Sequence, residues 1–252
     1  FSFVALIFCS LLLPNNVWAN ISTIKLATTD WCPYSCPNDK QNKGIAYDYV
    51  SHILQQKDIT ADIVSYPWAR AIRQVDTGAR HGLLTAVHSE SPDLLFTQVP
   101  MMSYQMCFYG LPELKWQYRN TTSLSNVSLA VIAEYGYGQP LDNFLAIESN
   151  RKNVVEISGN FGLERILALV SSGKVDVFIE DKNVFNWHLK HQESIREKKF
   201  KQLGCLAETP FYLALSPELI WAPEVIKMLN REFSSQANGR WLEFLISNRY
   251  SE

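Results

Sequence analysis

A short unit of helix, glycine and buried strand occurs twice in the chain, and this repeat constrains the fold most strongly. Residues 71–87 (AIRQVDTGARHGLLTAV) align without a gap with residues 166–182 (ILALVSSGKVDVFIEDK), so that Gly78 falls on Gly173. In each copy a helical pattern stops at the glycine, as at a helix C-cap. A repeat at this separation predicts two similar α/β halves rather than a solenoid, whose units are shorter. The alternative is that any helix-glycine-strand unit would align this well.

Strands and helices alternate along the whole chain. Apolar runs predict strands at residues 24–28, 61–66, 83–87, 129–133, 154–157 and 175–179, with helices between them and a last helical segment over residues 223–248. The chain has 252 residues, of which 47% are hydrophobic, which suits two packed lobes of roughly 100 residues each. The predicted class is therefore α/β, with a mostly parallel sheet flanked by helices in each lobe.

The first residues predict export. Residues 3–13 (FVALIFCSLLL) are apolar but fall short of the roughly 20 residues that span a bilayer, and Val17, Trp18 and Ala19 form a small-x-small ending. We interpret residues 1–19 as a signal peptide, so that the mature chain begins near Asn20 and is periplasmic. The alternative is a buried N-terminal strand or helix. No other segment is apolar and long enough to span a membrane.

Four cysteines remain after Cys9 is assigned to the signal peptide: Cys32, Cys36, Cys107 and Cys205. An even number in an exported protein favours two disulfides. Cys32 and Cys36 are close enough in sequence to bridge locally, which would leave a long-range link between the other two. A zinc site would need all four thiolates to converge, and the spacing does not require it. The connectivity does not follow from the sequence alone.

Charge and motifs exclude several classes of function. The net charge is −2, with no basic excess, so nucleic acid is not expected as a partner. No P-loop, dinucleotide fingerprint or Gly-x-Ser-x-Gly motif occurs, and no cofactor is expected. His188 and His191 lie three apart with only Glu193 nearby, a pattern that favours a solvated helix face over a metal site.

A series of short motifs, in order, resembles a known family. These are the Trp31–Tyr34 turn (WCPY), GIAYD from Gly44, PWARAI from Pro67, Phe96-Thr97 before Pro100, GKVD from Gly173 with Asp181 beyond it, FYLALSP from Phe211, and NGRW from Asn238. Together they are similar to the bacterial extracellular solute-binding proteins of family 3. These are the polar amino acid binding proteins of ABC transporters, with the type II periplasmic binding fold. The resemblance extends over residues 24–250.

The resemblance implies two discontinuous lobes. Lobe 1 would comprise residues 20–103 and 212–252, and lobe 2 residues 104–211, with hinge strands near residues 104–109 and 208–215. Cys107 and Cys205 would then lie on neighbouring strands near the hinge. Ligands of such sheets bind at the carboxyl ends of the strands. In the two repeats these ends are Thr85-Ala86 and Glu180-Asp181.

Several residues could then bind a ligand. The resemblance gives Asp181 the role of pairing with an ammonium group, against the alternative of a helix N-cap. Tyr34 and Trp68 could stack on the ligand, or simply pack in the core. Arg70 could bind a carboxylate, or be a solvated helix residue. Backbone N–H groups of Gly138 and Gln139 could bind an anionic group, with Tyr135 and Tyr137 beside them.

The chain departs from the family at one important position. The Thr-x-x-Arg motif that holds an α-carboxylate in the family is replaced here by a segment with Glu90, and no arginine or lysine lies between Arg80 and Lys115. Glu90 would favour a cationic group instead. The identity of the ligand therefore stays open.

The predicted function is the binding of a small polar solute, an amino acid or similar compound, by closure of two lobes. We expect a monomer that serves ABC-type uptake through an inner-membrane permease, and no catalytic activity. The alternatives are a periplasmic sensor domain and an enzyme on the same fold, such as a dehydratase or lytic transglycosylase. An enzyme would have to rely on Glu90, Asp181 or His88.

Overall fold

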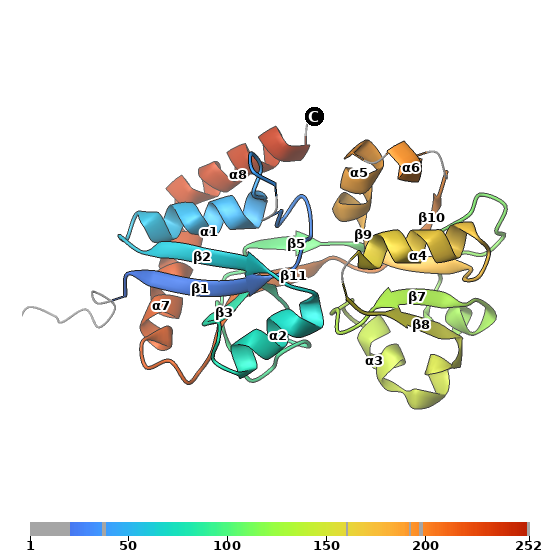
Figure 1. The fold of residues 1–252 in the computed structure, drawn as a ribbon, viewed down its shortest axis with the longest axis horizontal. Helices are drawn as coiled ribbons and strands as arrows, with labels where there is room; N and C mark the ends of the chain where they lie inside the picture. Colours follow the sequence, from blue (N-terminus) through green and yellow to red (C-terminus); the bar gives the residue numbers. More distant parts are fainter. Residues whose placement is uncertain (1–20, 37–38, 160, 192, 197–198, 251–252) are drawn as a thin grey trace, which may run out of the picture.

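Two separate β-sheets, each covered by helices, form two lobes that lie side by side (Figure 1). The computed structural model describes residues 21–36, 39–159, 161–191, 193–196 and 199–250, so the predicted signal peptide lies outside the described residues. Among the described residues, no helix combines the length and the hydropathy needed to cross a bilayer. The predicted α/β class with two lobes is confirmed.

Lobe 1 contains a sheet with the strand order β2-β1-β3-β11-β4, and β5 pairs with β11. Strands β1 (Thr23–Thr28), β2 (Thr60–Ser65) and β3 (Gly82–Ala86) are parallel, whereas β11 (Thr209–Leu215) runs antiparallel to β3 and to the short strands β4 (Leu95–Phe96) and β5 (Met102–Tyr104). Helices α1 (Ile45–Gln55), α2 (Trp68–Asp76), α7 (Ala222–Phe233) and α8 (Gln236–Tyr250) cover this sheet.

Lobe 2 has the strand order β10-β6-β9-β7-β8. Strands β7 (Leu129–Ile132), β8 (Val154–Ile157) and β9 (Val177–Asp181) are parallel, and β6 (Met106–Gly110) and β10 (Lys201–Cys205) complete the sheet in antiparallel pairs. Its helices are α3 (Leu141–Ala146), α4 (Gly162–Ser171), α5 (Lys182–His191) and α6 (Glu193–Arg196), with 3₁₀ turns at Thr121–Asn126 and Glu148–Asn153.

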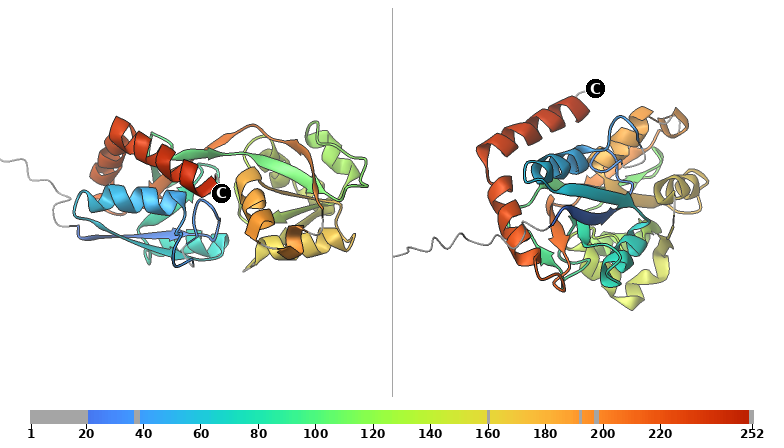
Figure 2. Two further views of the ribbon diagram at one scale, coloured as in Figure 1. Left: turned by 90° about the horizontal axis from the view of Figure 1, so that it is seen from above. Right: turned by 60° about the vertical axis from the view of Figure 1, so that its left-hand side comes forward.

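The chain crosses between the lobes twice, and both crossings are extended (Figure 2). Gln105 joins β5 of lobe 1 to β6 of lobe 2, and residues 206–208 join β10 back to β11. A hydrogen bond from Gln105 Nε2 to the Leu206 carbonyl oxygen (3.2 Å) ties the two crossings together. Two adjacent strand connections of this kind suit a hinge.

The sequence repeat corresponds to equivalent elements in the two lobes. The alignment that superposes Gly78 on Gly173 also places β3 on β9, and both are buried along their whole length. The two glycines have φ angles of 72° and 70°, the left-handed conformation expected after a helix end. The strand expected at residues 175–179 lies two residues later, because Lys174 and Asp176 occupy an exposed turn.

Both disulfides form in the structure. Cys32 pairs with Cys36, and Cys107 on β6 pairs with Cys205, its direct neighbour on β10. The predicted local bridge and the predicted long-range bridge are thus both confirmed.

Candidate ligand-binding cleft

The carboxyl ends of β1, β3 and β9 approach one another where the lobes meet, and a small cavity lies there. Its volume is about 30 Å³, close to the space that one water molecule occupies in the liquid. The lobes therefore contact each other closely here, an arrangement called the closed form below, and the space left between them is too small for a larger ligand. The cavity is lined by Thr29, Trp31, Trp68, Thr85, Val87, Glu90, Tyr104, Met106, Tyr135 and Gly136.

Glu90 places its carboxyl group between the lobes. Its Oε2 accepts a hydrogen bond from the backbone N–H of Val87 (3.0 Å) in lobe 1, and its Oε1 accepts one from Gly136 (2.7 Å) in lobe 2. Burial of the carboxyl group raises the pKa of Glu90 to about 8, and the two backbone hydrogen bonds only partly offset this rise. The indole N–H of Trp68 lies near enough to lower that pKa, but it forms no hydrogen bond of normal geometry.

Glu180 is a second buried carboxyl group at the same junction. The sequence placed it at a strand end, but it was not among the residues predicted to bind the ligand. Its Oε1 accepts hydrogen bonds from the Asp181 backbone N–H (2.8 Å) and, across the cleft, from Trp31 Nε1 (3.5 Å). Burial raises the pKa of Glu180 to about 8, and the neighbouring Asp181 carboxylate adds to the rise. Its position directly before Asp181 at the end of β9 was the only signal in the sequence.

Asp181 itself does not line the cavity. Its Oδ1 accepts the backbone N–H groups of Asn183 (2.9 Å) and Val184 (3.0 Å) at the start of α5, and its Oδ2 accepts that of Gln105 (2.8 Å), which joins β5 to β6 between the lobes. The carboxylate thus takes the alternative role of a helix cap, and it also anchors one crossing strand.

Tyr34 is also held in a packed position. Only 1% of its surface is exposed, and its ring contacts Trp31 and Phe211 at centroid distances of 4.5 and 5.3 Å. Its hydroxyl oxygen accepts a hydrogen bond from Asn183 Nδ2 (2.9 Å) in lobe 2. Tyr34 therefore belongs to the contact between the lobes rather than to the cavity wall.

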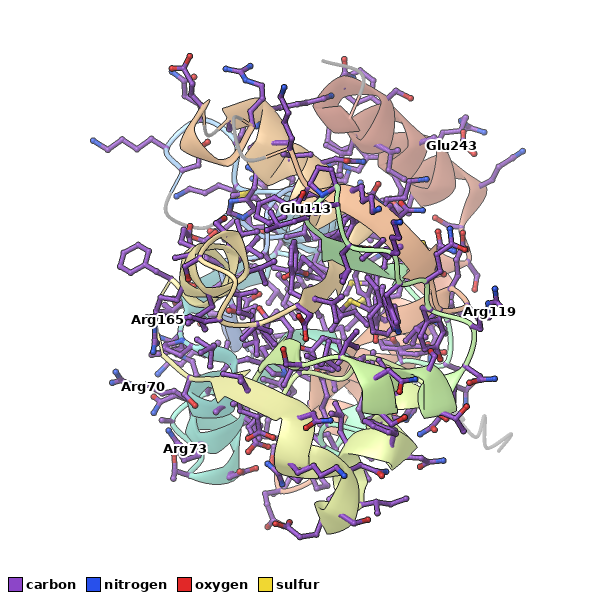
Figure 3. All side chains as sticks on the ribbon, turned by 90° about the vertical axis from the view of Figure 1, so that its right-hand side faces the viewer. Arg70, Arg73, Glu113, Arg119, Arg165 and Glu243 are labelled. Atoms are coloured by element: carbon purple, nitrogen blue, oxygen red, sulfur yellow. A yellow bond between two sulfur atoms is a disulfide. The ribbon has the colours of Figure 1, made fainter. Side chains whose placement is uncertain are left out.

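The groups predicted to bind an anion lie elsewhere or are occupied. Arg70 is exposed on α2, its guanidinium 5.4 Å from the centre of the Tyr66 ring, and Figure 3 shows it pointing outward. The backbone N–H groups of Tyr137 and Gly138 already donate to the Asp142 carboxylate at 2.8 and 3.1 Å. Gln139 is exposed. A ligand carboxylate would find none of these donors free in the cavity.

Other candidates from the sequence also lie outside the cavity. Tyr137 is buried, and its hydroxyl group bonds to the backbone of Ile132 (2.6 Å from the Ile132 N–H). His88 is exposed and stacks on Phe96. His191 stacks on Trp187, and the described residues contain no group of three or more side chains that could hold a metal ion.

A larger groove of about 1,110 Å³ lies between α1 and α8 of lobe 1 and α5 of lobe 2. Its walls carry scattered polar and aromatic side chains, including His52, Asn186 and Trp241. Glu90 does not line it. We therefore place the candidate site at the small cavity, which Glu90 lines and beside which Glu180 bonds to the lining residue Trp31.

Several hydrogen bonds cross between the lobes around the cavity. The Gly136 backbone N–H donates to Glu90, Trp31 Nε1 donates to Glu180, and Asn183 Nδ2 donates to the Tyr34 hydroxyl oxygen. In addition, Ser89 Oγ donates to Asp142 Oδ2 (3.1 Å). All of these would break if the lobes separated.

Comparison with solved structures agrees with this architecture. The chain is similar to a histidine kinase sensor domain with similarity to periplasmic binding proteins (TM-score 0.75, 13% identity, 92% of this chain and 97% of that one). It is also similar to a mutant of the arginine-binding protein from T. maritima (0.72, 13%, 92% and 96%). The fold is that of the two-lobed periplasmic binding proteins.

A third similar structure of this fold is an ancestral amino acid-binding protein described as a precursor of cyclohexadienyl dehydratase (TM-score 0.69, 16% identity, 91% and 96%). No protein-family model and no curated protein sequence matches the chain. Identities this low support the fold alone, so the function must be argued from the cleft.

Proposed function

We propose that the protein captures a small polar solute between its two lobes in the periplasm and delivers it to an uptake system of the ABC type. The observation that carries the proposal is the cavity at the strand ends, whose wall combines residues of both lobes, such as Trp68 and Tyr135, with the buried carboxyl group of Glu90. A ligand held there would replace the contacts between the lobes with its own and so stabilise closure.

The proposal is tested by a thermal-shift screen of amino acids, polyamines and small peptides, followed by small-angle X-ray scattering. A ligand at a hundred times its dissociation constant should add about 2.7 kcal/mol to the free energy of unfolding. The scattering should show a smaller radius of gyration with ligand than without. Nuclear magnetic resonance of the recovered ligand should show it unchanged, since turnover would indicate an enzyme.

A sensor domain is the second candidate, favoured by the similarity to the histidine kinase sensor domain. Deletion of the gene separates the two roles. Loss of uptake of the identified ligand supports transport, whereas normal uptake with a lost transcriptional response to the ligand supports sensing.

Gly136→Ala should weaken ligand binding at least about 5-fold without lowering the thermal stability of the unliganded protein. In the closed form a Cβ on Gly136 would clash with Val87 Cγ2 and lie 2.9 Å from Glu90 Cγ, both in the opposite lobe. Overpacking of this kind costs about 1–3 kcal/mol, and opening the lobes relieves it. Titration calorimetry measures the affinity.

Gly239→Ala is the matched control, because a Cβ at Gly239 meets nothing within 4 Å. It should bind like the parent protein. Equal affinity of Gly136→Ala and Gly239→Ala would mean that the ligand binds without the closure proposed here.

A further inference from the structure

Two glutamates lie at the cleft, one from each lobe. Glu90 follows β3 in lobe 1 and lines the cavity, whereas Glu180, the last residue but one of β9 in lobe 2, lies beside it and accepts a hydrogen bond from the lining residue Trp31. None of the ion pairs found among the described residues involves either glutamate. The residues that line the cavity include no lysine, arginine or histidine.

The other charged groups that act on these two glutamates are acidic as well. The Asp142 carboxylate acts on Glu90, and those of Asp181 and Glu164 act on Glu180. Burial raises the pKa of the Tyr135 phenol most, and the charges of Glu180 and Glu90 raise it further. Tyr135 is therefore close enough to interact with both glutamates. Buried carboxylates are stable only when they are neutral or paired with a cation. Among the described residues that line the cavity, no lysine, arginine or histidine supplies such a cation.

Aromatic side chains form much of the remaining wall. Trp31, Trp68, Tyr104 and Tyr135 all line the cavity, and the first three are at most 7% exposed. Aromatic faces attract cations, the more so when water is excluded. The backbone donors predicted to bind an anion, at Tyr137 and Gly138, lie outside this wall and are already bonded to Asp142. The indole N–H of Trp68 has no hydrogen-bond partner in the described part of the chain but lies beside the Glu90 carboxyl group, which would repel an anion there.

We propose that the ligand is a small organic amine or guanidine without an α-carboxylate, whose cationic group is held between Glu90 and Glu180 against the aromatic wall. This inference rests on the proposed function and narrows it. A free amino acid would bring its carboxylate to a cleft with two buried carboxyl groups and no free cation. An amine carries a positive charge, which no residue lining the cavity provides, and it carries no carboxylate.

The test compares matched pairs by titration calorimetry at pH 7.5: agmatine with arginine, cadaverine with lysine, and putrescine with ornithine. Members of a pair carry the same cationic side group and differ by the α-carboxylate. We expect at least one amine to bind at least 10-fold more tightly than its amino acid. Neutral and acidic amino acids and small peptides complete the panel.

The possible results separate the two proposals. If an amino acid equals or exceeds its amine, or if a neutral or acidic compound is the tightest ligand, the inference is overturned and solute capture stands. If no compound binds at millimolar concentration, solute capture fails, and the inference fails with it.

Glu180→Gln then tests the site. Both hydrogen bonds to Glu180 end on the same oxygen, Oε1, so glutamine can keep them while removing the charge. Loss of one partner of a buried charge pair should weaken amine binding about 30-fold or more, and Glu90→Gln should act in the same direction. Glu113→Gln makes the same change at an exposed position (Figure 3) and should have no effect. Unchanged amine binding in both Glu180→Gln and Glu90→Gln would overturn the assignment.

Discussion

Opening the Cys107–Cys205 disulfide should lower the free energy of unfolding by about 2–4 kcal/mol, the usual range for such bridges. The two cysteines are 98 residues apart in sequence, and the bridge closes a loop that holds most of lobe 2. A crosslink restricts the unfolded chain more as its loop grows. In the native sheet the two cysteines are already neighbours, since Cys205 pairs with Cys107 across β10 and β6.

Urea unfolding of the variant Cys107→Ala/Cys205→Ala measures this loss, with the parent protein under oxidising conditions as reference. The double variant Cys32→Ala/Cys36→Ala is the matched control, because its cysteines are only four residues apart. It should lose less stability. Equal losses in the two variants would show that the size of the closed loop does not govern the effect.

The repeat let the sequence predict most of the fold. Short buried strands bounded by glycine turns leave few alternatives, and Gly78 and Gly173 mark equivalent helix ends. The last helical segment was predicted only in outline, because it breaks into α7 and α8. Ser235 directly precedes α8 and caps it, because its Oγ accepts the Asn238 backbone N–H (3.2 Å). A serine cap three residues before an asparagine is a weak signal inside an apolar helical pattern.

The site was harder to predict than the fold for a physical reason. Successive side chains of a strand point to opposite faces, so a shift of one residue changes which one enters the cleft. At the end of β9 this choice lies between Glu180 and Asp181. Asp181 instead accepts three backbone N–H groups from α5 and the hinge. The sequence does not show whether Asp181 would bond to these backbone N–H groups or face the cleft.

The anion site predicted at Gly138 illustrates the same limit. A helix N-terminus offers free N–H groups, but here Asp142 of the helix itself occupies them. Glu90 was predicted from the sequence because it replaces an expected arginine, and it lines the cavity. Trp68, Thr85 and Tyr135 were predicted as well and also line the cavity, so a match to the family pattern and a departure from it both located the cleft.

The unliganded protein should become less stable in its closed form as the pH rises from about 5 to 8. Burial raises the pKa of both Glu90 and Glu180 to about 8 from the ordinary 4.5. Between these values the closed form binds more protons than the unfolded chain, so the stability present at low pH is lost as pH rises through the folded pKa. Each group can contribute at most about 1.4 kcal/mol per pH unit. Small-angle scattering should show a larger radius of gyration at pH 8 than at pH 5, because opening hydrates both carboxylates.

His81 has the opposite effect, since burial lowers its pKa and the stability it contributes is lost as the pH falls. A comparison of the parent protein with Glu180→Gln separates the contribution of His81 from that of the cleft glutamates. This variant keeps His81 and removes one of the two cleft carboxyl groups. Its thermal midpoint should fall less steeply between pH 5 and 8 than that of the parent protein. Parallel curves would contradict the prediction. A bound amine should flatten the parent curve further, because a cation between ionised glutamates supplies at pH 8 the neutralisation that protons supply at pH 5.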